Sequence, residues 1–449
     1  MDRCLVINKK HKWLGELPST WSIQPLNTIT SLVSIKNHAH LELLSLYRDY
    51  GVITKKSRDD NHNRAGSDLS KYKLVSKGDL VINKMKAWQG SVGISNYDGI
   101  ISPAYIICKV KPEIHSNYLN YLLRSNLYKH QYGKLSYGVR TNQWDIRYDD
   151  FKKLPVLLPP KPEQTTIANF LDYKLEKINR FISKKKQLIE LLHEQKAAII
   201  NQAVTKGLDP NVKMKDSGIE WLGEIPEHWE IWKIKWLSPV KRGASPRPIE
   251  NPIYFDENGN YAWVRIADVT ASERYLETTI QTLSELGSTL SVKQEPGDIF
   301  LSIAGSVGKP IITKIRCCIH DGFVWFPKLS INKEFLYYIF KGGQAYKGLG
   351  KMGTQLNLNT ETVGSIKIPL PIGEEMNQIV QFLDNELCQV DKVIKTVKKE
   401  ITLVEEYKTA LIAEAVTGKI DVRKWSKPLI LNDEMMGHNL KSSNKENQN

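Results

Sequence analysis

Cysteine is scarce in this 449-residue sequence and shows no paired pattern. The five cysteines are scattered, none belongs to a C-x-x-C pair, and the ten histidines show no ligand spacing beside them. Such a set fits neither a disulfide framework nor a zinc site. We therefore expect no bound metal.

Long apolar runs are also missing. No stretch approaches the roughly 18 consecutive apolar residues that a membrane-spanning helix needs. The N-terminal residues, MDRCLVINKKHKW, are charged and lack the apolar core of a secretory signal. These absences predict a soluble, cytoplasmic protein.

Catalytic patterns are few. The stretch Gly305-Ser306-Val307-Gly308-Lys309-Pro310 resembles a phosphate loop, but Ile303 and Pro310 occupy places where that loop has Gly and Ser or Thr. Gly-Ser-Val-Gly also occurs at residues 90–93, so a tight turn shared by both places explains the pattern better. No paired carboxylates with a lysine and no Ser-His-Asp signature stand out. The sequence favours binding over bond-breaking, and no catalytic residue is predicted.

One further motif requires comparison with an enzyme. Asn251-Pro252-Ile253-Tyr254 resembles the Asn-Pro-Pro-Tyr/Phe loop with which adenine methyltransferases hold a flipped base. The second proline is missing, the motif has no counterpart elsewhere in the chain, and no Gly-rich turn for an adenosyl cofactor precedes it. A stand-alone DNA adenine methyltransferase that uses Asn251 and Tyr254 is therefore an alternative that the sequence does not favour.

Positive charge is in excess. The formal net charge is +14 and the pI is about 9.2. Such a charge attracts polyanions, of which nucleic acid is the commonest large one in a cell. A basic scaffold that binds acidic proteins and not DNA is the other alternative that composition leaves open.

The chain is a tandem duplication. Phe382-Leu383-Asp384 lies 212 positions after Phe170-Leu171-Asp172, inside two similar long segments, residues 163–206 and 375–418. A Trp-Leu-Gly motif, Trp13-Leu14-Gly15 followed by Trp21, recurs 208 positions later at Trp221-Leu222-Gly223 followed by Trp229. The order is motif, variable segment and long helix, twice.

Each long segment carries an apolar row whose positions are spaced alternately by four and three. Lys185 and Lys196 interrupt the first row, and Lys408 interrupts the second. A period of about 3.5 residues over about five heptads indicates a coiled coil, and each helix would be about 60 Å long. The apolar members are Leu171, Leu175, Ile178, Ile182, Ile189, Leu192, Ile199, Leu383, Leu387, Val390, Ile394, Val397, Ile401, Val404 and Leu411. We expect Glu163 near the start of the first helix, and αL caps at Gly207 and Gly418.

The variable segments share landmarks but little residue identity. In the first, the pattern predicts a helix at residues 41–50, a strand after Lys77-Gly78-Asp79, a strand at 100–110 and a helix at 118–127. In the second, Pro296-Gly297-Asp298 also precedes a strand, and residues 335–340 form an aromatic helix. Two domains with one frame and different side chains are what two readers of different targets require.

DNA contacts need Lys and Arg for phosphates and guanine, and Asn and Gln for adenine. Loops rich in these residues supply the candidates, to which Trp88 and Tyr137 add aromatic rings. The predicted contacts are Lys84, Lys86, Gln89, Ser91, Arg140, Asn142 and Gln143 in the first segment, and Lys241, Arg242, Arg247, Arg265, Ser306, Lys309, Lys351, Gln355 and Asn357 in the second.

Two stretches carry a family resemblance. TKGLDPNVKMKDSGIEWLGEIPEHWE at residues 205–230 and LPPKPEQTTIANFLD at residues 158–172 closely resemble the specificity subunits of type I restriction-modification systems. The turns at residues 77–79 and 296–298 also look like that family's recognition domains. The resemblance extends to about Trp425.

The resemblance implies an α+β fold. Two target recognition domains of mixed strand and helix would be separated by two long helices that form an antiparallel coiled coil, with internal pseudo-two-fold symmetry. The expected domain limits are 1–26 for an N-terminal segment, 27–157 and 235–367 for the recognition domains, 158–208 and 368–425 for the long helices, 209–234 for a linker, and 426–449 for a disordered tail.

The resemblance also implies the partners. A protein of this kind binds double-stranded DNA with two methyltransferase subunits and two restriction or translocase subunits, and has no catalytic activity alone. Adenosylmethionine, ATP and magnesium would be bound by the partners and not by this chain. The target would be bipartite and asymmetric, with one recognition domain for each half.

Overall fold

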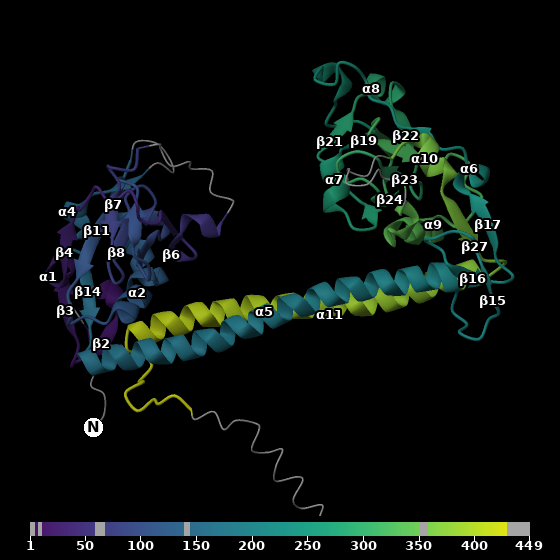
Figure 1. The fold of residues 1–449 in the computed structure, drawn as a ribbon. Coiled ribbons are helices and arrows are strands. Elements are labelled where there is room, and N and C mark those ends of the chain that lie inside the picture. The colour runs from purple at the N-terminus through teal and green to yellow at the C-terminus, as the bar shows by residue number, and fades with distance from the viewer. Residues whose placement is uncertain are drawn as a thin grey trace, which may run out of the picture. The chain divides into compact units, whose positions relative to one another are not determined.

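The computed structural model describes residues 5–7, 11–58, 68–138, 144–347, 349 and 358–428 (Figure 1). These residues form two compact units. Unit 2 is continuous and comprises Lys185–Lys398, whereas unit 1 combines the described residues on either side of it. The long helices α5 (Lys161–Lys206) and α11 (Glu375–Val416) therefore each contribute one half to each unit.

The centre of unit 1 is an antiparallel sheet with the strand order β4 (Thr30–Val33), β11 (Tyr105–Val110), β8 (Leu80–Asn83) and β9 (Val92–Ile94). Leu80, Val81 and Ile82 are all fully buried because both faces of the sheet are covered. Leu80 and Ile82 belong to the core that contains α2 (Ser116–Arg124). Val81 belongs to the core under the hairpin of β5 (Leu44–Tyr47) and β6 (Gly51–Thr54).

Shorter elements surround this sheet. The paired strands are β1 (Leu5–Ile7) with β2 (Glu16–Pro18), β3 (Ser22–Pro25) with β14 (Pro155–Leu158), β7 (Lys73–Val75) with β10 (Gly99–Ile101), and β12 (Ser136–Tyr137) with β13 (Asp145–Ile146). The short helices are α1 (Leu26–Ile29), α3 (Asn126–Lys134) and α4 (Tyr148–Phe151), with 3-10 turns at Lys12–Leu14, Lys55–Ser57 and Ala87–Gln89.

Unit 2 contains two sheets that share a core. The first has the order β18 (Lys241–Arg242), β26 (Phe323–Trp325), β23 (Ile299–Ser302), β24 (Pro310–Thr313) and β20 (Tyr275–Leu276). The second has the order β21 (Gln281–Leu283), β19 (Tyr261–Val264), β25 (Cys317–Ile319) and β22 (Val292–Gln294). Strand pairs β20–β24 and β19–β25 are parallel, and the others are antiparallel. Val264, Phe300 and Ile319 lie in one apolar cluster that joins the two sheets.

The other elements of unit 2 are short strands and helices. The paired strands are β15 (Met214–Asp216) with β16 (Glu224–Pro226), and β17 (Glu230–Lys233) with β27 (Lys367–Leu370). The helices are α6 (Ile234–Leu237), α7 (Ile266–Ala271), α8 (Glu285–Thr289), α9 (Lys333–Lys341) and α10 (Thr360–Ser365), with 3-10 turns at Pro252–Tyr254 and Gln344–Tyr346.

The two units share a strand order. The sheet β4-β11-β8-β9 of unit 1 corresponds to β18-β26-β23-β24 of unit 2. Before β8 and β23, Asp79 accepts a hydrogen bond from the backbone N–H of Ser76 at 2.8 Å, and Asp298 accepts one from Glu295 at 2.9 Å. The preceding glycines have φ of +94° and +92°, which favours glycine. The predicted turn into a strand is confirmed at both places.

In unit 1, the first half of α5 packs beside the last half of α11. Leu171 shares a core with Leu411 and Ala415. The lysine that interrupts the second apolar row is used between the helices, because Lys408 Nζ donates to Asn179 Oδ1 at 2.8 Å.

Unit 2 repeats this arrangement with the other two halves. Leu383 and Leu387 share a core with Ala203. Lys196, which interrupts the first row, forms an ion pair with Asp391 across the two helices, at 2.5 Å between Nζ and Oδ1. The apolar members of both predicted rows are buried or half-buried. Gly207 and Gly418 have φ of +73° and +74°, which confirms the predicted αL caps.

Three predictions of local structure are wrong or incomplete. Residues 41–50 form a strand and turn instead of a helix, since Leu44 and Leu46 alternate into the core and residues 48–50 make the hairpin turn that leads to β6 at Gly51. Residues 100–110 contain two strands, β10 and β11, and residues 118–127 contain two helices that meet at Ser125.

The two Gly-Ser-Val-Gly stretches do not form the same turn. Val92 of the first lies within β9 and pairs with Ile82. All of residues 305–308 precede β24, whose first residue, Pro310, pairs with Leu301. The expectation of a shared tight turn is wrong because the two stretches differ in strand register. Of the predicted tail at residues 426–449, the part from residue 429 onward lies outside the described residues.

No described helix is long and apolar enough to cross a membrane. Across the same residues, no group of three or more His, Cys, Asp or Glu side chains is placed to hold a metal ion. Burial raises the pKa of the Cys108 and Cys317 thiols to about 12, so both behave as core residues.

Candidate nucleic-acid interface

The loop between β8 and β9 carries the first group of predicted contacts. Asn83 Oδ1 accepts a hydrogen bond from the backbone N–H of Met85 at 3.2 Å, and Trp88 Nε1 donates to the carbonyl of Met85 at 3.2 Å. The Trp88 ring also lies 5.2 Å from the Trp144 ring, between centroids. These contacts brace the loop, while Lys86 stays exposed at its surface.

A groove of about 850 Å³ borders this loop. Lys86 and Gln89 line it together with Arg58, whose guanidinium lies 4.6 Å from the centre of the Tyr50 ring and 5.5 Å from that of Tyr47. A basic groove with aromatic rings can follow a nucleic-acid backbone and stack on bases. The sequence reasoning missed the arginine and both tyrosines, although tyrosines beside a basic run carried a signal.

The other predicted contacts of unit 1 differ in their accessibility. Ser91 is 2% exposed, so its hydroxyl offers almost no surface to DNA. The Tyr137 hydroxyl donates to Asp150 Oδ2 at 2.9 Å, and this bond raises the pKa of Tyr137. Lys84 is half-exposed at the base of the loop. Arg140, Asn142 and Gln143 lie outside the described residues.

In unit 2, two predicted arginines meet at one aspartate. Arg242 Nε donates to the backbone carbonyl of Asp321 at 2.5 Å, and Arg247 Nη2 donates to its Oδ2 at 3.1 Å. Ser245 Oγ donates to the other carboxylate oxygen at 3.2 Å. Burial alone would raise the pKa of Asp321, but the Ser245 bond and the positive charges of both arginines hold it below its usual value.

Arg265 lies at the same place. Arg247, from the loop after β18, and Arg265, from the end of β19, line one recess of about 740 Å³. Lys241 is exposed on β18, at the edge of the first sheet. The structure thus brings together Arg247 and Arg265, two predicted cations from segments that are separate in the sequence.

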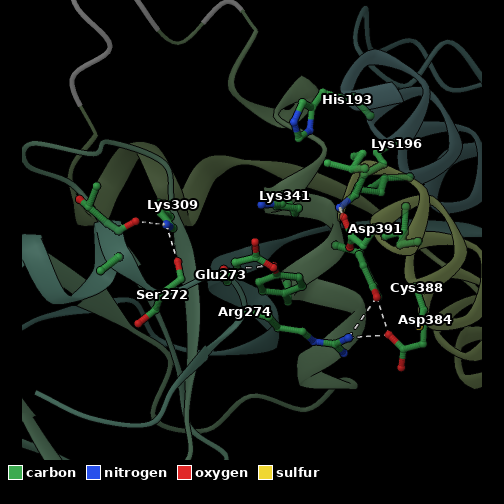
Figure 2. A pocket seen from close by; sticks show the side chains of 18 of the residues that line it. His193, Lys196, Ser272, Glu273, Arg274, Lys309, Lys341, Asp384, Cys388 and Asp391 are labelled. Carbon is green, nitrogen blue, oxygen red and sulfur yellow. Dashed lines mark hydrogen bonds and ion pairs between the residues drawn. The ribbon is translucent and has the colours of Figure 1, made fainter. Parts of the chain in front are cut away.

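Ser306 and Lys309 are half-buried and form hydrogen bonds within the protein. Lys309 Nζ donates to the backbone carbonyls of Thr270 at 3.0 Å and Ser272 at 2.6 Å, as Figure 2 shows. Ser306 Oγ and Thr270 Oγ1 are 2.7 Å apart. Burial lowers the pKa of Lys309. These contacts fix the loop against α7 and use two of the three N–H donors of Lys309. Lys351, Gln355 and Asn357 lie outside the part of the chain that the structure describes.

The methyltransferase-like motif is a local cap. Asn251 Oδ1 accepts from the backbone N–H of Ile253 at 3.1 Å, and the Tyr254 hydroxyl donates to the carbonyl of Arg247 at 3.0 Å. The asparagine oxygen and the aromatic residue that would hold a flipped adenine are therefore both engaged within the loop. N-capping of the turn at Pro252–Tyr254 accounts for the motif.

Each Trp-Leu-Gly motif is joined to a long helix of its own unit. Trp21 Nε1 donates to Glu163 Oε2 at 3.1 Å in unit 1, and Trp229 Nε1 donates to Glu375 Oε2 at 2.8 Å in unit 2. Both glutamates lie in the first helical turn, where the helix dipole favours a carboxylate. The tryptophans therefore connect each motif to the start of a long helix.

The repeated Phe-Leu-Asp aspartates make a second connection. In unit 1, the Tyr121 hydroxyl of α2 donates to Asp172 Oδ1 at 2.5 Å. In unit 2, the Tyr338 hydroxyl of α9 donates to Asp384 Oδ1, and Arg274 Nη1 donates to the same oxygen at 2.5 Å (Figure 2). The aspartate that the two repeats share therefore joins each long helix to another helix or loop of the same unit.

Arg274 makes four hydrogen bonds to three residues of unit 2. Besides Asp384, its guanidinium donates through Nε to Glu334 Oε2 at 2.8 Å, through Nη2 to the same oxygen, and through Nη1 to the Tyr338 hydroxyl at 3.0 Å. Burial by itself would lower the pKa of Arg274, but the hydrogen bonds to Asp384 and Glu334 outweigh it and raise the pKa. The sequence reasoning missed this arginine because Glu334 lies 60 residues away and Asp384 110 residues away.

Comparisons with known proteins agree with this duplicated architecture. A family model described as type I restriction modification DNA specificity domain matches residues 25–191 and again residues 226–406. The chain is 27% identical to the type I restriction enzyme MjaVIII specificity subunit of Methanocaldococcus jannaschii, over 91% of this chain and 94% of that protein. It is 21% identical to the EcoKI specificity subunit of Escherichia coli, over 90% of each chain.

Solved structures share the fold. A chain from a structure of complex assembly and conformational transition of the type I R-M system aligns with a TM-score of 0.70 and 17% identity, over 90% of this chain and 99% of that one. The HsdS subunit from Thermoanaerobacter tengcongensis aligns with a TM-score of 0.51 and 16% identity, over 90% of this chain and 98% of that one. The resemblance seen in the sequence is confirmed, and this chain belongs to the family of type I restriction-modification specificity subunits.

Proposed function

We propose that this chain is the DNA-reading subunit of a type I restriction-modification complex and that its target is bipartite and asymmetric. Residues 27–157 read one half-site and residues 235–367 the other. The shared strand order of two units with unlike surfaces carries this proposal. Unit 1 presents a groove with tyrosines and Lys86, whereas unit 2 presents a recess with Arg247 and Arg265. One frame with two sets of side chains suits two different half-sites.

Phosphate contacts supply the affinity that does not depend on sequence. The net charge of +14 favours binding of a polyanion. Lys86 lines the groove of unit 1 and Lys241 is exposed on β18 of unit 2, and such lysines can position a duplex without reading it.

We infer that residues 158–208 and 368–425 form an antiparallel coiled coil that separates the recognition domains and relates them by a pseudo-two-fold axis. The shared cores of α5 and α11 in each unit support this inference, as do the Lys408–Asn179 and Lys196–Asp391 contacts. A seam closed along its length acts as a spacer, and the number of unread base pairs between the half-sites follows from it.

The partners follow from the family. The duplicated frame offers two similar docking surfaces, which suits two copies of a methyltransferase subunit and two restriction or translocase subunits. In this proposal the chain is not catalytic, and adenosylmethionine, ATP and magnesium are bound by the partners. The engagement of Asn251 and Tyr254 within their own loop supports a non-catalytic role.

Exchange of one recognition domain tests the proposal. Replacement of residues 27–157 by the corresponding segment of a relative should change one half of the target and leave the other half and the gap unchanged. Mapping of methylated adenines in cells that carry the chimaeric chain and its partner subunits gives both half-sites at once. A change in both halves would exclude independent readers, and random methylation would exclude sequence-specific recognition by this chain.

A further inference from the structure

The recess in unit 2 has the size and the lining of a binding site. Its volume of about 740 Å³ lies within the range of about 300–1,000 Å³ that is usual for small-molecule sites. Trp263, His320, Arg247, Arg265, Asp321 and Ser245 line it. All six belong to the recognition domain of unit 2 and come from the loop after β18, from β19 and its end, and from the turn between β25 and β26.

Aromatic rings form one wall of the recess. Trp263 is 4% exposed, and its ring lies 5.9 Å from that of His320, between centroids. The His320 ring is in turn 4.6 Å from the Phe323 ring, so its position is fixed from behind. Within the described residues, the indole N–H of Trp263 donates no hydrogen bond, so it is available to a ligand.

The His320 ring supplies a second hydrogen-bond donor, after the indole N–H of Trp263. Its Nδ1 accepts from the backbone N–H of Gly322 at 2.8 Å. Burial lowers the pKa of His320, although Asp321 acts in the opposite direction, and the neutral ring therefore carries its proton on Nε2.

Charged groups supply the remaining recognition elements. The Asp321 carboxylate is held by Ser245 and Arg247 and is an acceptor for amino groups. The Nε of Arg265 is buried without a hydrogen-bond partner among the described residues, and its closest counter-charge is Asp268 at 3.8 Å. An incompletely satisfied guanidinium at the edge of a recess is suited to a phosphate or a base carbonyl.

A recess of this kind does not suit a base that remains paired. Base edges in a groove are read by side chains that protrude from the protein surface. A recess with a ring wall, an acceptor carboxylate and several donors is complementary to the face and the edge of a base that has left the stack. The predicted DNA contacts Arg242 and Arg247 adjoin the recess, so the duplex would pass its opening.

We propose that this recess receives one extrahelical base from the half-site that unit 2 reads, with Trp263 and His320 against the base, Asp321 as acceptor for its amino group and Arg265 on the flanking phosphate. This inference rests on the proposed function. It adds that part of the second half-site is read by extrusion of a nucleotide into this chain, separately from any base that a partner subunit modifies.

A fluorescent base scan tests the inference in the assembled modification complex. The target is first obtained by mapping of methylated adenines, and 2-aminopurine then replaces each base of the second half-site in turn, apart from the methylated adenines. This analogue is bright when it is unstacked and dim inside a duplex. We expect one position to brighten on binding, and a mismatch opposite that position to tighten binding because the pair no longer has to be opened.

Variants of the recess identify where the base goes. Arg265→Gln and Asp321→Asn should each abolish the brightening and weaken binding of the cognate duplex about tenfold, which is a usual loss for one base contact. The matched control is Arg316→Gln in the same unit, because Arg316 is 63% exposed, pairs with Glu295 and does not line the recess. It should bind and brighten like the unsubstituted chain. Thermal unfolding of each variant shows whether the fold is kept. If Arg265→Gln unfolds, Asp321→Asn alone decides the test.

The outcomes separate the two proposals. If the complex binds its target specifically but every scanned position stays dim, the recess holds no base and the proposed function stands. If brightening persists in Arg265→Gln and Asp321→Asn, the base leaves the stack for a partner subunit and this inference is wrong. If binding does not distinguish the target from a scrambled duplex, both proposals fail.

Discussion

Removal of the Asp384 carboxylate should loosen the joint between the recognition domain of unit 2 and α11. Asp384→Ala abolishes the hydrogen bonds from the Arg274 guanidinium and the Tyr338 hydroxyl. The matched substitution is Asp172→Ala, 212 positions earlier, where the partners are the neutral Tyr121 and Asn117. The duplication thus provides a comparison in which the same residue has a charged partner in one unit only.

The expected magnitudes follow from these contacts. A hydrogen bond to a charged group contributes about 1.5–3 kcal/mol to stability, and a neutral one about 0.5–1.5 kcal/mol. The Asp384 side chain is 44% exposed, so solvent screens its ion pair, and Arg274 keeps Glu334 as a partner. We expect Asp384→Ala to lower the free energy of unfolding of unit 2 by about 2 kcal/mol. The Asp172 carboxylate is also charged, but it is exposed and its partners Tyr121 and Asn117 are neutral, so Asp172→Ala should cost unit 1 less, about 1 kcal/mol.

Calorimetry of the full chain measures the difference. For a unit of about 200 residues, a loss of about 2 kcal/mol lowers the Tm by about 4–8 °C. The functional readout is binding to targets whose unread gap is one base pair longer or shorter than the natural gap. We expect Asp384→Ala to reduce the discrimination between these gaps. Equal destabilisation by the two substitutions would refute a role of the Arg274 ion pair, and unchanged gap discrimination would show that this contact does not set the position of the domain.

Three further predictions concern salt, spacing and pH. Lys86→Gln and Lys241→Gln should each reduce the slope of log affinity against log salt by about 1, and a slope that does not change would remove these lysines from the phosphate contacts. Insertion of four residues near Lys185 lengthens the helix by about 6 Å and should lengthen the unread gap by about two base pairs. Mapping of methylated adenines measures the gap, and an unchanged gap would show that the helices do not act as a spacer. Burial lowers the pKa of His320 in the folded chain. As the pH falls below about 6.5, the imidazole is therefore protonated in the unfolded chain before it is protonated in the folded one, and unit 2 loses stability. His320→Gln should make the Tm difference between about pH 7.5 and about pH 5.5 smaller, and an equal difference would exclude His320 as its source.

Periodic features were predictable from the sequence because they are local. The rows that include Leu383 and Leu387 fix the inner side of each long helix, and Gly207 and Gly418 end the helices where αL caps are expected. The turns before β8 and β23 were also predictable, since glycine and aspartate in that order have a specific backbone role. Repetition of these features made the family recognisable.

Short strands were harder to predict. Leucines at residues 41–46 fit a helix as well as a strand, and only the hairpin partner at β6 decides between them. Such pairing is tertiary information that a single window does not contain.

The candidate interface was predicted only in part, for the same reason. Arg247 and Arg265 were chosen as basic loop residues, but the aromatic wall of Trp263 and His320 is assembled from different strands. The ion pairs of Arg274 join residues that are far apart in the sequence, and no spacing rule identifies them. Lys309 shows the converse case, in which a predicted contact is bound to the protein's own carbonyls.

The division of the chain has a consequence for biosynthesis. Unit 2 is complete once Lys398 has been translated, but the core of unit 1 also contains Leu411, Val416 and Val422. During translation, all of unit 2 is therefore synthesised before the last part of unit 1. A polypeptide that stops before these residues leaves an apolar surface of unit 1 uncovered. Such a truncated chain should be degraded by proteases before it can replace the full-length chain on DNA.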